Sequence, residues 1–300
     1  MECQRSLGRR ITPGGATGGA LNAGIVEGFA VLKVSSFQVA RDDDGDNRGD
    51  VRCDDACHPH PEKSSPFADG FPNEIRVAVS DGVSNTSFSG IWSNLLVSAY
   101  MAGDLGAGVS PKQLLAYQLQ WWDRVTTAWP NLTGTPLLMA RRGASATFLG
   151  LSIRPEPSGG GGVWRAEARG DSCLALVRSR IVDEKFPLKS ASQFGQLTPA
   201  ISTGRFTNGT LADTDGNRPV EAITSCCGSA VPGDTFFLMT DALAKWFYSA
   251  HEKGESPWED LTGFAELREF AEWVRLKRKS GELENDDVTM VLARYSDEDC

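Results

Sequence analysis

The sequence predicts an α+β protein of layered architecture with largely antiparallel sheets. Strand-like apolar runs gather in the first third, in the middle and at the end of the chain, and helical segments lie between these groups. Strands and helices do not alternate one by one, as the βαβ units of a parallel sheet require. With 300 residues, the chain fits one large domain or two small ones and can bury a substantial core.

The strands are predicted from short apolar runs, some of which include alternating polar residues. Residues 29–39 (FAVLKVSSFQV) alternate in part, and residues 235–239 (TFFLM) follow a Pro-Gly-Asp turn. The Gly-rich stretch 155–162 is interpreted as a hairpin loop, because no Gly-Lys-Ser/Thr sequence follows to make it a phosphate-binding loop. Further strands are expected at residues 75–80, 144–153, 163–168, 173–178 and 287–295.

Three segments have the pattern of helices. Residues 89–101 are expected to be helical after the strand at 75–80. Ser110 and Pro111 supply an N-cap and a proline at the first helical position, and the residues that follow have one apolar face. Residues 261–279 form a strongly amphipathic helix. The stretch 186–230 lacks clear periodicity and is interpreted as a surface excursion.

Composition and charge limit the classes of function. The formal net charge of −9 argues against a general nucleic-acid binder, which normally has a basic face. No apolar run reaches the roughly 18 residues that a membrane-spanning helix needs. The cysteines number 7, and their irregular spacing favours a reduced intracellular setting. We therefore expect a cytoplasmic protein with neither nucleic acid nor membrane as a partner.

Four short acidic segments, each beside a strand-like run, are the most informative feature of the sequence. An aspartate at the end of an apolar strand is locally unfavourable, because its charge resists burial. Several such strand ends in one chain therefore indicate carboxylates gathered around a cation. Oxygen ligands with few histidines favour Mg²⁺ or Mn²⁺ over zinc, so the pattern predicts a metal-dependent hydrolase. The segments are Cys53-Asp54-Asp55-Ala56, Val79-Ser80-Asp81-Gly82, Met239-Thr240-Asp241 and Asn285-Asp286-Asp287-Val288-Thr289.

Six short motifs resemble, in their order, those of the metal-dependent serine/threonine protein phosphatases of the type 2C (PPM-type) family. The resemblance extends from about residue 28 to residue 296. No motif is specific alone, and their common order and spacing carry the resemblance. The motifs are CDDA (53–56), VAVSDG (77–82), GASAT (143–147), GDS (170–172), FLMTD (237–241) and DDVTMVL (286–292).

The resemblance implies a four-layer α-β-β-α sandwich with two antiparallel sheets. A single domain would cover residues 28–296, with the excursion at 186–230 in the place of the family's flap. Residues 1–27 are expected to form a flexible N-terminal segment because of their many glycines, and residues 297–300 a short tail.

The resemblance also implies hydrolysis of phosphoserine and phosphothreonine in proteins, such as the targets of a cognate serine/threonine kinase. The cofactors would be two Mn²⁺ or Mg²⁺ ions, because a pair of divalent cations activates a water and offsets phosphoryl charge. By resemblance, Asp81 bridges both ions, and Asp55, Asp81 and Asp241 are catalytic through the activated water. The implied metal ligands are Asp54, Asp55, Asp81, the Gly82 carbonyl, Asp241 and Asp286.

Departures from the family pattern support an alternative function. Asp54 stands where a glutamate is usual, and Ala242 replaces a glycine. Lys245 replaces an aspartate that would join Asp171 around a third ion, so Asp171 is kept as an accessory candidate only. The alternative is a catalytically weak relative that acts as a phosphoprotein-binding or regulatory module.

The segment around the first motif raises two further questions. Asp50 occupies the spacing of the family's phosphate-binding arginine, so this role is assigned to Arg48 or Arg52. A more distant alternative is a zinc-stabilised interaction protein built on a nearby Cys-x₃-Cys-His-x-His cluster, which we interpret as a coincidence in a Pro-rich loop. The residues of that cluster are Cys53, Cys57, His58 and His60.

Overall fold

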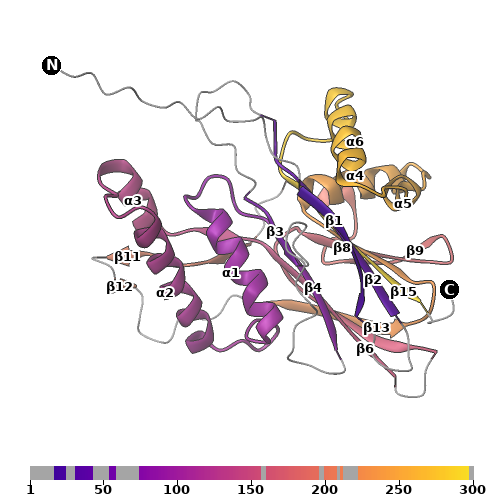
Figure 1. Cartoon of the computed structure of the whole chain (residues 1–300), viewed down its shortest axis with the longest axis horizontal. Helices are drawn as coiled ribbons and strands as arrows, with labels where there is room; N and C mark the ends of the chain where they lie inside the picture. Colours follow the sequence, from indigo (N-terminus) through magenta and orange to yellow (C-terminus); the bar gives the residue numbers. More distant parts are fainter. Residues whose placement is uncertain are drawn as a thin grey trace.

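A computed structural model shows two antiparallel sheets stacked face to face, with helices covering both outer faces (Figure 1). Three separate apolar clusters lie between the resulting four layers. The α+β class and the four-layer α-β-β-α sandwich that the sequence predicts are therefore confirmed. The structure describes residues 17–24, 31–42, 54–58, 74–156, 160–195, 199–207, 210–211 and 222–296.

The first sheet has six strands in the order β1-β2-β15-β14-β8-β9, all antiparallel. Residues 17–24, which the sequence suggests are flexible, form its edge strand and pair with the neighbouring strand through their backbone. The strands are β1 (Thr17–Gly24), β2 (Val31–Val39), β8 (Cys173–Arg178), β9 (Ile181–Phe186), β14 (Thr235–Met239) and β15 (Val288–Ser296).

The second sheet has five strands in the order β13-β7-β6-β4-β3. Parts of the stretch 186–230 belong to regular structure, because it includes β13, one strand of a small ladder and both strands of a second one. The large-sheet strands are β3 (Ala56–His58), β4 (Ile75–Ser80), β6 (Phe148–Pro155), β7 (Gly162–Arg169) and β13 (Thr224–Ala230). The small ladders pair β5 (Ser145–Ala146) with β10 (Ile201–Ser202), and β11 (Phe206–Thr207) with β12 (Thr210–Leu211).

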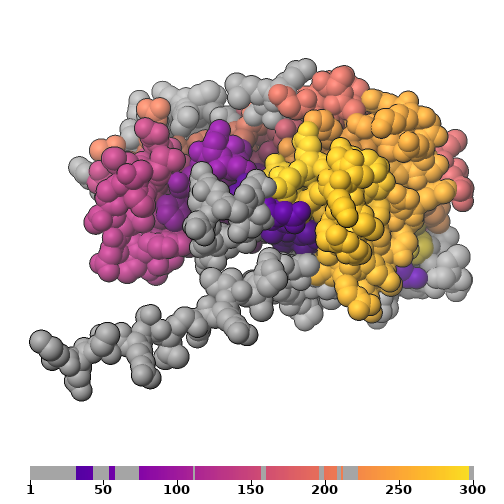
Figure 2. Space-filling view, turned by 90° about the horizontal axis from the view of Figure 1, so that it is seen from above, coloured from indigo at the N-terminus to yellow at the C-terminus, as the bar shows by residue number. Residues whose placement is uncertain are grey.

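The helices form two groups on opposite sides of the sandwich. Figure 2 shows α2 and α3 on one side, in magenta, and α4 to α6 on the other, in orange and yellow. The capping box expected at Ser110 is present, with the Gln113 N–H donating to the Ser110 hydroxyl at 3.3 Å. The helices are α1 (Ser89–Ala102), α2 (Pro111–Ala128), α3 (Gly134–Arg142), α4 (Asp241–Glu252), α5 (Pro257–Thr262), α6 (Leu267–Lys279) and a 3₁₀ turn at Ala191–Gln193.

The central strands are apolar on both faces because both faces are covered. In β14, Phe236 and Leu238 point into the cluster between the sheets, whereas Phe237 and Met239 point towards the α4 to α6 layer. Trp92 of α1 lies in the third cluster, under the second sheet's outer face. None of the helices in the described part of the chain is long and apolar enough to cross a membrane.

Candidate metal centre

The four acidic segments meet at one end of the sandwich. Met239 pairs with Met290, so the end of β14 lies next to the start of β15. Ala56 pairs with Ser80, so the start of β3 lies next to the end of β4. Strand β15 also contacts β3 and β4 across the space between the sheets. The convergence of strand-end aspartates that the sequence predicts is therefore present in the structure.

Asp55 is buried and Asp81 half-buried at the centre of this acidic cluster. Burial raises the pKa of Asp55 well above its ordinary value, and the charge of Asp287 raises it further. Burial likewise raises the pKa of Asp81, followed by the charges of Asp55 and Asp241. A hydrogen bond between Asp55 and Asp81 favours the proton on Asp81. Asp55 therefore raises the cost of ionising Asp81.

Asp241 and Asp286 complete the acidic cluster. Burial raises the pKa of Asp241 to about 7, with contributions from the charges of Asp171 and Asp286. The Asp241 carboxylate accepts a hydrogen bond of 2.5 Å from the Ala242 N–H at the start of α4. Burial also raises the pKa of Asp286. Asp171 thus lies near Asp241, as its accessory assignment supposed, whereas Lys245 pairs with Glu284.

The chemistry of these donors fits a hard divalent cation. They are carboxylate oxygens, and Asp55 Oδ1 is buried with no hydrogen-bond partner among the described residues. Mutual repulsion and burial raise the pKa values of the carboxyls, as expected for ligands without their ion. As they stand, no three His, Cys, Asp or Glu side chains in the described part of the chain form a closed metal-binding group.

Asp54 lies at the edge of the acidic cluster, where it meets the N-terminus of α1. Burial and the charge of Asp287 raise its pKa, while Arg41, the Ser89 hydroxyl and the Gly90 N–H lower it. Its carboxylate thus satisfies the start of a helix, where negative charge is favourable. This contact is an alternative to metal ligation for Asp54.

Gly82 fits tightly between Asp54 and the start of α1. A Cβ atom at this position would lie 2.7 Å from the Asp54 carbonyl oxygen and 2.9 Å from Ser89 Cβ. On either side of Gly82, the Asp81 carbonyl accepts from the Thr147 N–H and the Val83 N–H donates to the Ser145 carbonyl, around the Gly82–Ala146 bridge. The antiparallel pattern therefore turns the Gly82 N–H and carbonyl away from β5 and leaves the carbonyl free of this pairing.

A layer of buried hydroxyl groups supports Asp55 and Asp81. The Thr240 hydroxyl donates to Asp55 Oδ2 at 3.1 Å and accepts from the Thr289 N–H at 3.0 Å. The Thr147 hydroxyl accepts from the Asp81 N–H at 3.0 Å and lies 2.7 Å from the Ser172 hydroxyl. We assigned these residues no role from sequence, although each stands in a motif beside or opposite an aspartate.

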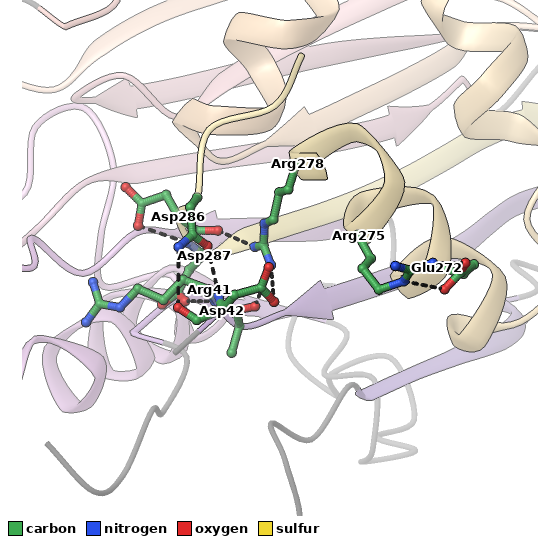
Figure 3. Close-up of polar contacts among 9 residues, drawn as sticks. Arg41, Asp42, Glu272, Arg275, Arg278, Asp286 and Asp287 are labelled. Atoms are coloured by element: carbon green, nitrogen blue, oxygen red, sulfur yellow. Dashed lines mark hydrogen bonds and ion pairs between the residues drawn. The ribbon is translucent and has the colours of Figure 1, made fainter. Parts of the chain in front are cut away.

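Arg41, at the end of β2, was not identified from sequence. Its guanidinium donates to the Ser84 hydroxyl at 3.2 Å, in the loop that follows Gly82, and its charge lowers the pKa values of Asp54 and Asp286. Figure 3 shows its side chain extending past Asp286. The sequence did contain a signal for a role of Arg41 at the site, because this residue lies between a predicted strand that ends at residue 39 and the acidic run that begins at residue 42.

Some residues to which the sequence assigned a role are not part of this cluster as the structure describes it. The two arginines proposed to bind phosphate, Arg48 and Arg52, lie outside the described residues, as do Cys53 and His60 of the proposed zinc cluster. Cys57 is buried in β3 and packs in the cluster between the sheets, where burial raises the pKa of its thiol. This placement does not favour a thiolate ligand in a surface loop.

Comparison with known proteins finds the same fold in solved phosphatases. The sequence matches no protein-family model and no curated protein sequence. A solved phosphatase from a pathogenic strain of Toxoplasma gondii is 11% identical, with a TM-score of 0.55 over 95% of this chain and 97% of that one. The S. agalactiae serine/threonine phosphatase is 13% identical, with a TM-score of 0.49 over 88% of this chain and 99% of that one. The Mycobacterium tuberculosis serine/threonine phosphatase PstP/Ppp is 15% identical, with a TM-score of 0.48 over the same shares.

These similarities establish the fold of the chain. The chain has the α+β sandwich of phosphatases, and specifically the fold of the type 2C serine/threonine phosphatases.

Proposed function

We propose that this protein is a metal-dependent phosphatase that hydrolyses phosphoserine and phosphothreonine in other proteins. The observation that carries the proposal is the convergence of Asp55, Asp81 and Asp241, one buried and two half-buried carboxyls whose pKa values are all raised. Carboxyls so costly to keep together are expected where they hold cations. The substrates would be phosphorylated proteins, such as the targets of a cognate serine/threonine kinase, in the cytoplasm.

The residues of the centre have distinct roles in this proposal. Asp81, the Gly82 carbonyl, Asp241 and Asp286 would hold two Mn²⁺ or Mg²⁺ ions, with Asp55 beside them. When bound, such ions supply an activated water and offset charge on the phosphoryl oxygens. Thr240 would orient Asp55, because its hydrogen bond to Oδ2 leaves Oδ1 free. Asp54 would act from outside the ligand set, through its contact with α1.

The direct test is hydrolysis of p-nitrophenyl phosphate and of a phosphothreonine peptide by the full chain. We expect turnover with Mn²⁺ or Mg²⁺ and none with EDTA. Folded protein that shows no turnover with either ion would contradict the proposal.

A second candidate function is a phosphoprotein-binding or regulatory module of the same fold. The contact of Asp54 with α1 favours it, because it engages a side chain of the ligand set that the resemblance implies. Lys245 favours it too, because it stands in the place of an aspartate and pairs with Glu284. This candidate predicts that a phosphothreonine peptide binds without being hydrolysed. Calorimetric titration with that peptide separates the two functions.

Arg41 is expected to bind the phosphoryl group of the substrate. Its guanidinium faces the acidic cluster from the side of Ser84, and a charge-assisted hydrogen bond to an anion contributes about 1.5–3 kcal/mol. Arg41→Gln should therefore lower kcat/KM for the peptide roughly 10- to 100-fold, mainly through KM. Arg154→Gln, on the exposed end of β6, is the matched control and should leave both constants unchanged. Equal kcat/KM values for the wild type and Arg41→Gln would refute this role.

A further inference from the structure

Arg278 lies on the last turn of α6 but directs its guanidinium inward, to the segments that carry the acidic cluster. Its side chain is only 6% exposed. One terminal nitrogen donates to the backbone carbonyl of Asp286, and the other donates to the Ala40 carbonyl at 3.0 Å. The second nitrogen also lies 3.3 Å from Asp42 Oδ1. Figure 3 shows Arg278 reaching from the helix to these two segments.

The two segments that Arg278 joins are also joined to each other and to the segment before β3. Asp287 Oδ1 accepts from the Arg41 N–H at 2.8 Å, and Asp287 Oδ2 accepts from the Asp54 N–H at 2.6 Å. Asn285 Oδ1 accepts from the Asp42 N–H at 2.9 Å. Three stretches of chain that are distant in sequence are thus fixed relative to one another, and Asp286 lies in the middle of one of them.

The contacts of Arg278 are better suited to fixing geometry than to adding stability. Its two main acceptors are neutral carbonyls, and its one carboxylate partner, Asp42, is 61% exposed. Arg278 Nε is buried without a hydrogen-bond partner among the described residues. A buried guanidinium with such partners recovers little of its desolvation cost. Its rigid planar fork, however, can hold two carbonyls at a set separation, which a lysine cannot do.

We propose that Arg278 is a positioning residue that fixes Asp286 against the end of β2 so that the acidic cluster can bind divalent cations. The inference rests on the proposed function and adds to it a residue that contacts no reacting group. Arg278 acts on the backbone of Asp286, whose carboxylate is in turn oriented by the Asp287 N–H at 2.9 Å. Its positive charge also lies beside the acidic stretch 284–287, where it offsets repulsion between neighbouring carboxylates.

The test compares two arginines of the same helix. Arg278→Gln removes the fork, whereas Arg275→Gln removes an exposed arginine that pairs with Glu272, one turn away in α6 (Figure 3). Mn²⁺ affinity is measured on the full chain from the electron paramagnetic resonance signal of free Mn²⁺. Loss of a residue that orients a ligand typically weakens metal binding about 10- to 100-fold. We expect this loss for Arg278→Gln and wild-type affinity for Arg275→Gln.

Two further measurements separate positioning from a general loss of structure. Arg278→Ala should regain Mn²⁺ affinity in millimolar guanidinium chloride, far below denaturing concentrations, because the free ion can occupy the emptied site. Arg278→Lys keeps the charge without the fork and should bind Mn²⁺ nearly as weakly as Arg278→Gln. Equilibrium urea unfolding in EDTA reports whether each variant is folded.

The outcomes distinguish the inference from the function on which it rests. Wild-type protein that binds no Mn²⁺ would overturn the proposed function and this inference with it. Wild-type protein that binds Mn²⁺ no more tightly than folded Arg278→Gln and Arg278→Lys would overturn the positioning role alone. Weakened binding that guanidinium restores in Arg278→Ala would support it.

Discussion

Asp81→Asn is expected to abolish Mn²⁺-dependent hydrolysis of the phosphothreonine peptide and to make the metal-free protein more stable. Asp81 is the carboxyl that meets Asp55 and Asp241 at the centre of the acidic cluster. A metal ion contributes several kcal/mol to transition-state stabilisation, and each 1.36 kcal/mol changes the rate tenfold. Loss of a carboxylate that would hold the ions should therefore lower kcat about 1000-fold or more.

The gain in stability follows from the sign of the pKa shift. A carboxyl with a higher pKa in the folded protein favours folding below its unfolded value, and it loses that contribution as the pH rises through its folded value. The ordinary value for Asp81 is 3.8, and burial raises its pKa well above this. At neutral pH in EDTA, ionising the Asp81 carboxyl in the folded wild type therefore costs stability, and an asparagine at this position has no such cost. The difference in stability should narrow as the pH is lowered towards about 4.

Urea unfolding in EDTA and steady-state kinetics with Mn²⁺ check the two parts of this prediction. Asp123→Asn is the matched control, because Asp123 lies on the exposed face of α2. It should change neither quantity. An Asp81→Asn protein that keeps Mn²⁺-dependent turnover would rule out Asp81 as a ligand. One that unfolds more readily than the wild type in EDTA would show that repulsion does not dominate the metal-free centre.

Sequence predicted those elements of the fold whose pattern of apolar residues or capping residues matches the surroundings that the structure gives them. Residues 235–239 are apolar at nearly every position because β14 is covered on both faces, and Ser110 caps α2 through its own neighbours. The helix expected at 261–279 is interrupted, since α5 ends at Thr262 and α6 begins only at Leu267. The apolar spacing continues across this break because both segments pack on the same cluster.

The candidate site was predictable to the extent that its residues stand at strand ends. The acidic segments could be found because an aspartate directly after an apolar run is unusual, and this signal can be read without knowing how the strands pair. The contacts of Asp54 and Arg278 could not be found, because they join residues that are far apart in the sequence. For Arg41, its place near the end of a predicted strand was a signal, but its contact with Ser84 could not be found. Asp54 meets a helix that starts 35 residues later, at Ser89, and Arg278 meets the end of β2, 238 residues earlier. No local pattern records such a contact.

Asp234 is expected to be the charged residue whose loss costs most stability without touching the metal centre. It lies in the turn between β13 and β14, where the chain passes from one sheet to the other, and its side chain is fully buried. It accepts two hydrogen bonds of 2.8 Å from Arg178 and one of 2.9 Å from the Val231 N–H. Arg178 also donates to the Ser229 carbonyl at 2.8 Å, so this ion pair joins β8 to the end of β13.

Asp234→Asn should lower the free energy of unfolding by about 2–3 kcal/mol. Breaking a buried ion pair costs about 3–5 kcal/mol, and we reduce this figure because the Arg178 side chain is 30% exposed and can be solvated. Asp183→Asn is the matched control, since Asp183 pairs with the same arginine at 3.3 Å but is 49% exposed. It should cost no more than about 0.5 kcal/mol.

Equilibrium urea unfolding of the two variants and the wild type measures this difference. Mn²⁺ affinity should stay at the wild-type value in both variants, because Asp234 precedes β14 and Asp241 follows it, at the strand's opposite ends. Equal losses of stability in the two variants would mean that the fully buried carboxylate contributes no more than an exposed one. The link between the sheets at this end would then depend on the backbone of the turn, including the 2.9 Å hydrogen bond from the Tyr295 N–H to the Asp234 carbonyl, rather than on the ion pair.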